Sequence, residues 1–191
     1  TAQCHVGDIR DEARLNSLFE GVDVVFHLAA LKHVILCERS PFDATQTNII
    51  GVKNVIQAAL NNNVERVIFT SSDKAVDPTN VLGTSKLMGE RLITAANSMK
   101  INKRTIFSST RFGNVLGSRG SVATVFERQI KAGGPVTLTD SEMTRFVMTL
   151  KDACRLVLQA SEIARGGEVF VTKMPIMRIE DLAKVMIYRL A

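Results

Sequence analysis

The stretch VDVVFHLAA, residues 22 to 30, carries β-branched and aromatic residues that run into a small, polar end. This is the pattern of a strand that is buried in a parallel sheet. VERVIFTSS (64–72) and RTIFSSTRF (104–112) repeat it. Long amphipathic segments separate the three runs, so the chain alternates strand and helix in the way that α/β proteins do.

Other segments complete this prediction. Shorter strands are expected at AQCHV (2–6), PVTLT (135–139) and GEVFV (167–171). Helices are expected over six amphipathic segments: 11–21, 40–63, 81–100, 121–134, 149–167 and 178–191. We find no internal repeat and no linker.

Polar residues follow each of the three main strands, in segments 27–32, 70–74 and 111–117. Ligands of parallel sheets bind outside the carboxyl ends of the strands. We therefore expect these three segments to meet at one edge of the sheet and to form a site there.

The composition narrows the class of protein. The 191 residues are 46% hydrophobic and 23% charged, which is enough to bury the core of a globular domain. Cys4, Cys37 and Cys154 lack the paired spacing of a zinc site or a disulfide framework, which indicates a reducing, cytoplasmic setting and no metal. No apolar run approaches the roughly 20 residues of a membrane span, so we expect no membrane contact from this chain.

The net charge of +5 does not indicate nucleic-acid binding. Basic and acidic residues are interleaved along the chain, and aromatic residues make up only 5% of it. A ligand that carries a diphosphate needs only a few of these basic residues.

A dinucleotide-binding doubly wound sheet opens with a strand, a GxGxxG turn and a helix that holds the pyrophosphate. No GxGxxG occurs here. We expect a partial Rossmann-like domain over residues 1–191 that lacks the first strands and this loop and begins near the third strand, at CHVGD (4–8). Elements of a substrate-binding region are expected from about residue 115 onward.

Eight collinear segments resemble the extended short-chain dehydrogenases, and among them the UDP-N-acetylglucosamine 4,6-dehydratases of polysaccharide and glycan biosynthesis. The segments are GDIRD (7–11), FHLAALKHV (26–34), ERSP (38–41), TNIIGVKNVIQAA (47–59), TSSDKAVDPTNVLGTSK (70–86), RFGNVLGSRGSV (111–122), EMTRFVMT (142–149) and EVFVTKMP (168–175). The SDKA box and RFGNVLGSRGSV are particular to the dehydratases. The resemblance implies a lyase that oxidises carbon 4 of the sugar transiently and removes water across carbons 5 and 6.

The resemblance assigns catalytic roles. Asp73 corresponds to the acid that protonates the leaving hydroxyl of carbon 6, and Lys74 to the base that takes the proton from carbon 5. Lys86, expected in the first turn of a helix, corresponds to the lysine that binds the nicotinamide ribose. An isolated strand-end SDK is commonly just a turn, and an isolated helical lysine is commonly solvated.

The resemblance also implies NADP as cofactor, with NAD left open because the strand that decides between them is absent. The cofactor contacts that it implies are Asp8, Ile9, Leu28, Ala29, Lys86, Val115, Leu116, Gly117, Ser118 and Arg119. Asp8 has a second interpretation, as the cap of the helix that follows it.

Substrate contacts follow in the same way. They are Lys32, Asn114, Val122, Thr139 and Arg145, and the ligand is a UDP-sugar. We interpret His27 and His33 as structural, since no carboxylate or cysteine set accompanies them at metal spacing.

Leu82 departs from the usual pattern, because a tyrosine normally lies four residues before the lysine and takes the proton from the hydroxyl that is oxidised. Family members with methionine at this position still dehydrate, and leucine is similar in volume and equally inert. The base at carbon 4 therefore stays open. So do the alternatives of a UDP-sugar 4-epimerase or reductase and of a catalytically silent nucleotide-sugar-binding module.

The resemblance also implies a homo-oligomer. Segments 41–62 and 80–100 correspond to the helix pair through which this superfamily dimerises. Ile49, Val52, Val55 and Ile56 place apolar residues on more than one face of the first segment, which supports this expectation.

Overall fold

The computed structural model describes residues 2–118 and 120–190. The chain divides into two compact units. Unit 1 comprises Thr1–Arg111 and Leu156–Val171, and unit 2 comprises Phe112–Arg155 and Thr172–Ala191.

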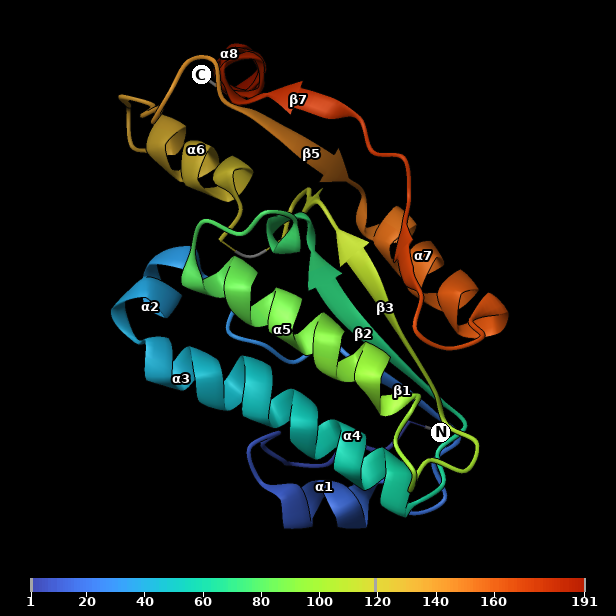
Figure 1. Cartoon of the computed structure of the whole chain (residues 1–191). Coiled ribbons are helices and arrows are strands. Elements are labelled where there is room, and N and C mark those ends of the chain that lie inside the picture. Colours follow the sequence, from blue (N-terminus) through green and yellow to red (C-terminus); the bar gives the residue numbers. More distant parts are fainter. Residues whose placement is uncertain (1, 119, 191) are drawn as a thin grey trace. The chain divides into compact units, whose positions relative to one another are not determined.

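Unit 1 is built on a four-stranded parallel sheet (Figure 1). In spatial order its strands are β1 (Val24–His27), β2 (Arg66–Ser72), β3 (Ile106–Phe112) and β6 (Val169–Val171). β1 pairs in parallel with β2, and β3 pairs in parallel with β6. The predicted α/β class is confirmed, as are the three main strands and the strand predicted at 167–171.

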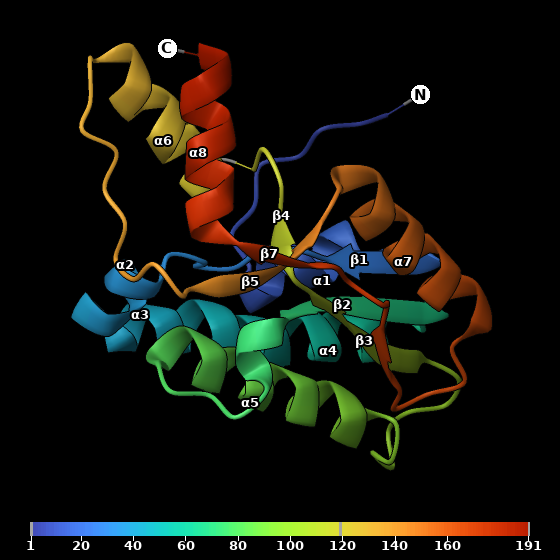
Figure 2. The same cartoon turned by 90° about the horizontal axis from the view of Figure 1, so that it is seen from above.

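Helices cover this sheet. Those of unit 1 are α1 (Glu12–Leu18), α2 (Val34–Arg39), α3 (Pro41–Thr45), the π-helix η1 (Gln46–Ile50), α4 (Gly51–Asn61), the 3₁₀ turn η2 (Asp73–Ala75), α5 (Val81–Ala96) and the second half of α7 (Leu150–Ile163). Figures 1 and 2 show α4 and α5 side by side along one face of β1–β3. The core between them contains Val55 of α4 and Ile93 of α5, together with Val67, Phe69 and Phe107 of the strands.

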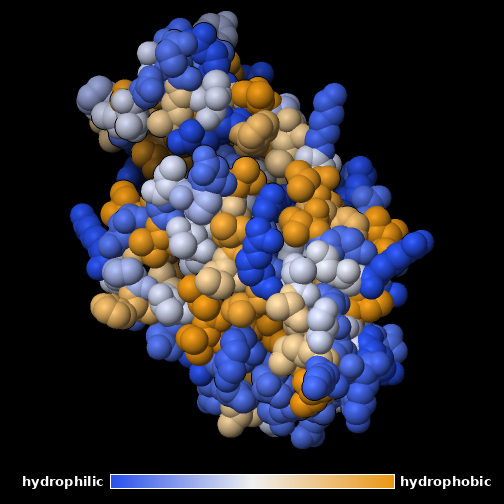
Figure 3. All heavy atoms as spheres, in the orientation of Figure 1, coloured by the Kyte–Doolittle hydropathy of each residue, from blue (hydrophilic) through white to orange (hydrophobic). Residues whose placement is uncertain are grey.

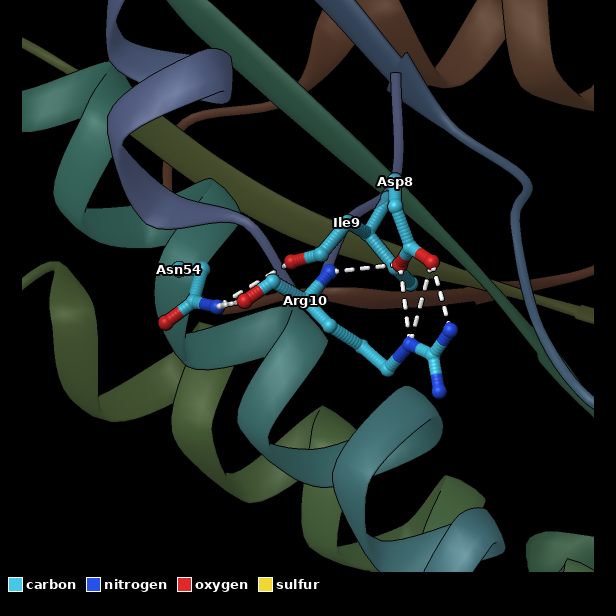
Figure 4. Close-up of polar contacts among 4 residues, drawn as sticks. All are labelled: Asp8, Ile9, Arg10 and Asn54. Carbon is cyan, nitrogen blue, oxygen red and sulfur yellow. Dashed lines mark hydrogen bonds and ion pairs between the residues drawn. The ribbon is translucent and has the colours of Figure 1, made fainter.

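Local signals explain where two of these helices begin. Asn80 precedes α5, and its side-chain oxygen accepts a hydrogen bond from the Gly83 N–H at 2.8 Å. Asp11 caps α1 in the same way through the Arg14 N–H. The interpretation of Asp8 as the cap of this helix is therefore wrong. Asp8 precedes the capping residue Asp11 in the chain, and its carboxylate accepts a hydrogen bond from the Arg10 N–H instead (Figure 4).

The segment predicted as one helix over 40–63 contains a π-helical turn. This turn directs Asn48 into the interior, where 2% of it is exposed. Asn48 accepts a hydrogen bond from Leu31 N at 2.8 Å and donates to Leu31 O and Ser85 Oγ, each at 3.0 Å. One buried amide thus ties the segment after β1 to helix α5.

Unit 2 has a smaller sheet. Its strands, in spatial order, are β4 (Asn114–Val115), β5 (Thr144–Met148) and β7 (Ile176–Arg178), and its helices are α6 (Val122–Lys131), α8 (Ile179–Leu190) and the first part of α7. β5 runs parallel to β4 and antiparallel to β7. Phe126 of α6 packs with Ile179 and Ala183 of α8 to form the core of this unit.

Two short strands were predicted wrongly. Residues 135–139 form no strand, because Gln129 of α6 binds the Thr137 N–H at 3.2 Å and the Thr137 hydroxyl at 2.8 Å in place of a neighbouring strand. Val136 packs against the cluster around Phe126. Residues 2–6 also form no strand; Val6 is 92% exposed, and its carbonyl accepts from Arg14 Nε.

The helices can also be compared with the length and hydropathy of a membrane span. Among the residues that it describes, no helix is both long and apolar enough to cross a bilayer.

Candidate active site

Asp73 and Lys74 form an ion pair at the end of β2. Lys74 Nζ lies 3.1 Å from Asp73 Oδ1, and the same oxygen accepts a hydrogen bond from Ser72 Oγ at 2.7 Å. Ser72 Oγ in turn accepts from the Lys74 N–H, which starts the 3₁₀ turn η2. The side chains are 18% (Asp73) and 31% (Lys74) exposed, so both groups are held in place and are accessible from solvent.

Lys86 is buried behind this turn. It is the sixth residue of α5, so it lies in the second helical turn rather than the first as predicted, and only 7% of it is exposed. Its Nζ donates to Thr70 O at 3.0 Å and lies 4.8 Å from the centre of the Phe69 ring. Burial lowers the pKa of Lys86 to about 8, against the opposing influence of Cys37 and Glu90. The interpretation as a solvated helical lysine is wrong.

His27 ends β1 beside the same aromatic ring. Its ring centroid lies 5.5 Å from that of Phe69, and the side chain is buried with Nε2 unpaired among the described residues. Burial, and secondarily the positive charge of Lys86, lower the pKa of His27 to about 4. His27 is therefore neutral at physiological pH, as expected of a structural histidine.

Leu82, which occupies the position of the usual tyrosine, is buried inside unit 1. It is 4% exposed and belongs to a buried apolar cluster with Cys37 of α2 and Ala44 of α3. Its side chain therefore contributes packing and no proton-transfer group.

A partly buried ion pair lies one turn further along α5. Glu90 binds Arg111 of β3 through two hydrogen bonds, Nε to Oε1 at 2.8 Å and Nη2 to Oε2 at 2.7 Å. This bidentate geometry fixes α5 to the carboxyl end of β3 and so fixes the position of Lys86 on the helix.

The segments predicted to touch the cofactor and sugar after β1 are accessible. Leu28, Ala29 and Lys32 are all exposed in the stretch between β1 and α2. Asp8 is also exposed, and its carboxylate binds Arg10, whose hydrogen bonds lower the pKa of Asp8 to about 2. Ile9 packs against the core near α4.

The remaining predicted residues lie in unit 2. Asn114 Nδ2 donates to Phe146 O at 2.9 Å and so links β4 to β5, the strand that carries Arg145. Leu116 N donates to Met148 O. Val115 lies in β4, and Gly117 and Ser118 lie in the loop after it. Val122 is the first residue of α6, and Thr139 lies in the loop before β5. Arg119 lies outside the described residues.

Unit 2 also contains a cavity of about 250 Å³. Leu116, which was predicted to touch the cofactor, lines it together with Met148, Asp152 and Lys173. Its lining includes both charged and apolar side chains.

The sequence analysis missed several residues that support the site. Ser72 donates a hydrogen bond to Asp73, and Glu90 binds Arg111. Asn48 holds the segment after β1 through Leu31. Ser72 is the first residue of the SDKA box and could have been recognised as a side chain that precedes a turn. In the described part of the chain, no group of three or more metal-binding side chains gathers.

The whole chain, residues 1–191, matches the family described as polysaccharide biosynthesis protein. The chain belongs to this family. Solved structures of a dTDP-glucose 4,6-dehydratase from Streptomyces venezuelae and of a UDP-glucose 4-epimerase from Thermotoga maritima share its fold, with TM-scores of 0.88 and 0.82 at 23% and 22% identity.

Three curated relatives show the range of names within this similarity. An uncharacterised membrane protein of Methanocaldococcus jannaschii is 54% identical over 99% of the chain and 57% of the relative. The UDP-glucose 4-epimerase of Rickettsia massiliae is 46% identical over 96% of the chain and 54% of the relative. The inverting UDP-N-acetylglucosamine 4,6-dehydratase of Campylobacter jejuni is 44% identical over 95% of the chain and 54% of the relative.

A solved structure agrees closely with this fold. The X-ray structure of Pen from Bacillus thuringiensis is 50% identical, with a TM-score of 0.96 over 98% of this chain and 60% of that one. The chain spans little more than half the length of the curated relatives described above.

Proposed function

We propose that the protein to which this chain belongs is a nucleotide-sugar 4,6-dehydratase that acts on UDP-N-acetylglucosamine. The observation that carries this proposal is the Asp73–Lys74 pair at the end of β2, where an acid and a base are in hydrogen-bond contact. The similarity to the dehydratase of Campylobacter jejuni supports it.

The pair suits an elimination because it can supply and accept a proton together. Moving one proton across the 3.1 Å contact converts the ion pair into a neutral lysine and a protonated aspartic acid. Lys74 then takes the proton from carbon 5 of the 4-keto sugar, and Asp73 gives its proton to the hydroxyl that leaves carbon 6 as water. The pair returns to the ionic form, so protons balance.

Loss of the carbon 5 proton requires a ketone at carbon 4, and a bound nicotinamide dinucleotide supplies the hydride acceptor for that oxidation. The residues present fit such a group. Lys86 uses one N–H donor on Thr70 O, which leaves two for ribose hydroxyls, and Asp8 offers an exposed anionic acceptor. We propose NADP as the first choice, with NAD as the alternative.

Leu82 excludes a phenol as the base at carbon 4. The turn that carries Asp73 and Lys74 packs against Gly83, the residue after Leu82, so we assign the hydroxyl proton to this pair, directly or through water.

The test is product analysis with the full-length protein. UDP-N-acetylglucosamine should lose water, as detected by mass spectrometry, and Asp73→Asn should abolish this reaction while leaving the fold intact. Asp77→Asn is the matched control, because Asp77 is exposed and has a positive φ that asparagine also adopts. Full turnover by Asp73→Asn would overturn the assignment.

A 4-epimerase is the second candidate, since the Rickettsia massiliae relative bears that name. An epimerase transfers hydride and proton at carbon 4 and removes no water. Conversion of UDP-glucose to UDP-galactose by the wild-type protein, without water loss from any UDP-sugar, would favour this candidate.

A further inference from the structure

Gly83 lies where the turn η2 packs against helix α5. It is the third residue of α5 and is buried. Lys74 of η2 and Pro78 of the loop between the two elements lie next to Gly83 on the side where other residues carry a Cβ atom. The main chain of the turn therefore comes into direct contact with the helix at this point.

A Cβ atom at position 83 would overlap the carbonyl oxygen of Lys74. It would also lie 3.1 Å from the carbonyl carbon of Lys74 and 3.0 Å from Pro78 Cβ, whereas ordinary contacts are 3.4–4 Å long. Two of these three atoms belong to the main chain and the third to a proline ring, so no flexible side chain can rotate away. Any residue other than glycine here requires either the turn or the helix to move.

Of the two elements, the helix is held more firmly. The Gly83 N–H donates to Asn80 Oδ1 at 2.8 Å, which fixes the first turn of α5. Further along the helix, the buried Lys86 Nζ donates to Thr70 O of β2 at 3.0 Å. The turn η2, in contrast, is three residues long, and its charged side chains are partly exposed. We therefore expect a larger residue at position 83 to displace the turn.

A displaced turn would carry the Asp73–Lys74 pair with it. The pair is held within the turn, because Asp73 Oδ1 accepts from Lys74 Nζ at 3.1 Å and from Ser72 Oγ at 2.7 Å. Both groups would thus move relative to Lys86, which stays bound to β2. A misplacement of about 1 Å between reacting groups can cost about a hundredfold in rate.

The conformation of the helix does not itself require glycine at position 83. Its φ is not positive, so the backbone there is open to any residue. Glycine is also less favourable than alanine inside a helix, because it loses more conformational freedom on folding. The contact with Lys74 is what accounts for glycine at this position.

We propose that Gly83 is a positioning residue, which lets the carbonyl group of Lys74 lie against α5 and thereby sets the position of the Asp73–Lys74 pair relative to Lys86. This inference rests on the proposed function, which assigns the proton transfers of the elimination to this pair.

The experiment separates rate from binding in the full-length protein. Gly83→Ala is compared with the wild type in two measurements. Loss of water from UDP-N-acetylglucosamine gives kcat and KM, and calorimetric titration with NADP and with NAD gives the dissociation constant and the number of sites per chain.

Gly51→Ala is the matched control. Gly51 is also a buried helical glycine of unit 1, but the three atoms nearest to an added Cβ there all belong to the side chain of Ile9. The same methyl group is thus added to a helix without pressing on the turn η2.

We expect Gly83→Ala to lower kcat about a hundredfold, while KM, the dissociation constant and the number of sites stay within about threefold of the wild type. Gly51→Ala should keep the wild-type kcat. A loss of folded protein would instead reduce the number of sites in the same proportion as kcat.

A second variant covers the case in which Gly83→Ala does not fold. Gly83→Ala combined with Pro78→Gly removes the contact with the proline ring and gives the turn room to move. This double variant should fold, bind the dinucleotide and show the same loss of kcat.

The contrary outcomes are distinguishable. Wild-type kcat in a folded Gly83 variant, a parallel loss of kcat and dinucleotide sites, or failure of both variants to fold would overturn the positioning role of Gly83 and leave the proposed function standing. A wild type that removes no water from UDP-N-acetylglucosamine would overturn the proposed function, and with it this inference.

Discussion

Leu82 and Cys37 lie in one buried apolar cluster, so the residue at the tyrosine position faces the interior of unit 1. Ala44 completes the cluster, and Leu31, Val34 and Val81 pack around it. A larger side chain at position 82 has to displace these neighbours or leave the cluster.

We therefore expect Leu82→Tyr to destabilise the protein by about 1–3 kcal/mol through overpacking and to change the dehydration rate only modestly. Denaturant unfolding and product formation by the full-length protein check the two effects. Leu82→Met, which conserves volume, is the control. An inactive wild type together with an active Leu82→Tyr variant would show that the chain is a silent descendant of an enzyme.

The second prediction concerns Lys86. Its pKa of about 8 lies below the ordinary lysine value, so the unfolded chain binds a proton more readily between about pH 8 and 10.5. The free energy of unfolding should therefore rise with pH across that window, by about 3 kcal/mol, an order-of-magnitude figure. Lys86→Met should lack this rise.

Other groups titrate in the same range, so the free energy of unfolding is measured at pH 7.5 and at pH 10 for both the wild type and Lys86→Met. The quantity compared is the change between the two pH values in each protein. Lys53→Met removes an exposed lysine of α4 and should leave the profile unchanged. Equal pH dependence in Lys86→Met and the wild type would mean that the ammonium is not desolvated.

The third prediction concerns His27. Because burial depresses its pKa to about 4, the unfolded chain takes up a proton first as the pH falls from about 6.5. Stability should thus be lost between about pH 6.5 and 4. His27→Phe should reduce this acid sensitivity, and His33→Gln, which changes an exposed histidine, should not. The free energy of unfolding of each protein is measured at several pH values by denaturation followed with circular dichroism.

The fourth prediction is a homodimer formed through the surface of η1, α3 and α5. Figure 3 shows hydrophobic and hydrophilic residues interspersed on the face that carries α3–α5. Val52, Val55 and Ile56, three of the residues that suggested this surface, are wrong candidates because they lie in the core of unit 1. The exposed apolar residues are Phe42, Ile50 and Met88.

Ile50→Glu combined with Met88→Glu should weaken the dimer about tenfold or more in light scattering at micromolar concentration. The matched control is Ile101→Glu, since Ile101 is similarly exposed outside these helices. A wild type that is strictly monomeric would exclude the dimer altogether.

Much of the fold was predictable because hydrophobic patterning determines it. Most of β2 and β3 is buried on both faces, so the composition of the runs at 64–72 and 104–112 indicates strands of a parallel sheet. The run at 22–30 has a similar composition, although part of β1 is exposed. The sequence of unit 2 gives a weaker signal. The pattern at 135–139 alternates as a strand does, but Gln129 satisfies its main chain, and the sheet uses residues 144–148 instead.

The site was predictable where chemistry is local. Asp73 and Lys74 are adjacent in sequence, and the structure pairs them. Contacts over long sequence distance were not predictable, such as Asn48 with Leu31 or Asn54 with Ile9. A π-helical turn directs Asn48 inward, and a pattern with a period of 3.6 residues gives no sign of it.

Strand β1 has a practical consequence for anyone who expresses residues 1–191 alone. It pairs with β2 on one side, and no strand in the described part of the chain pairs with its other side. Val24 and Phe26 are each 38% exposed along it. An open strand edge with apolar residues invites edge-to-edge aggregation during purification, and replacing Phe26 by lysine is the first remedy to try.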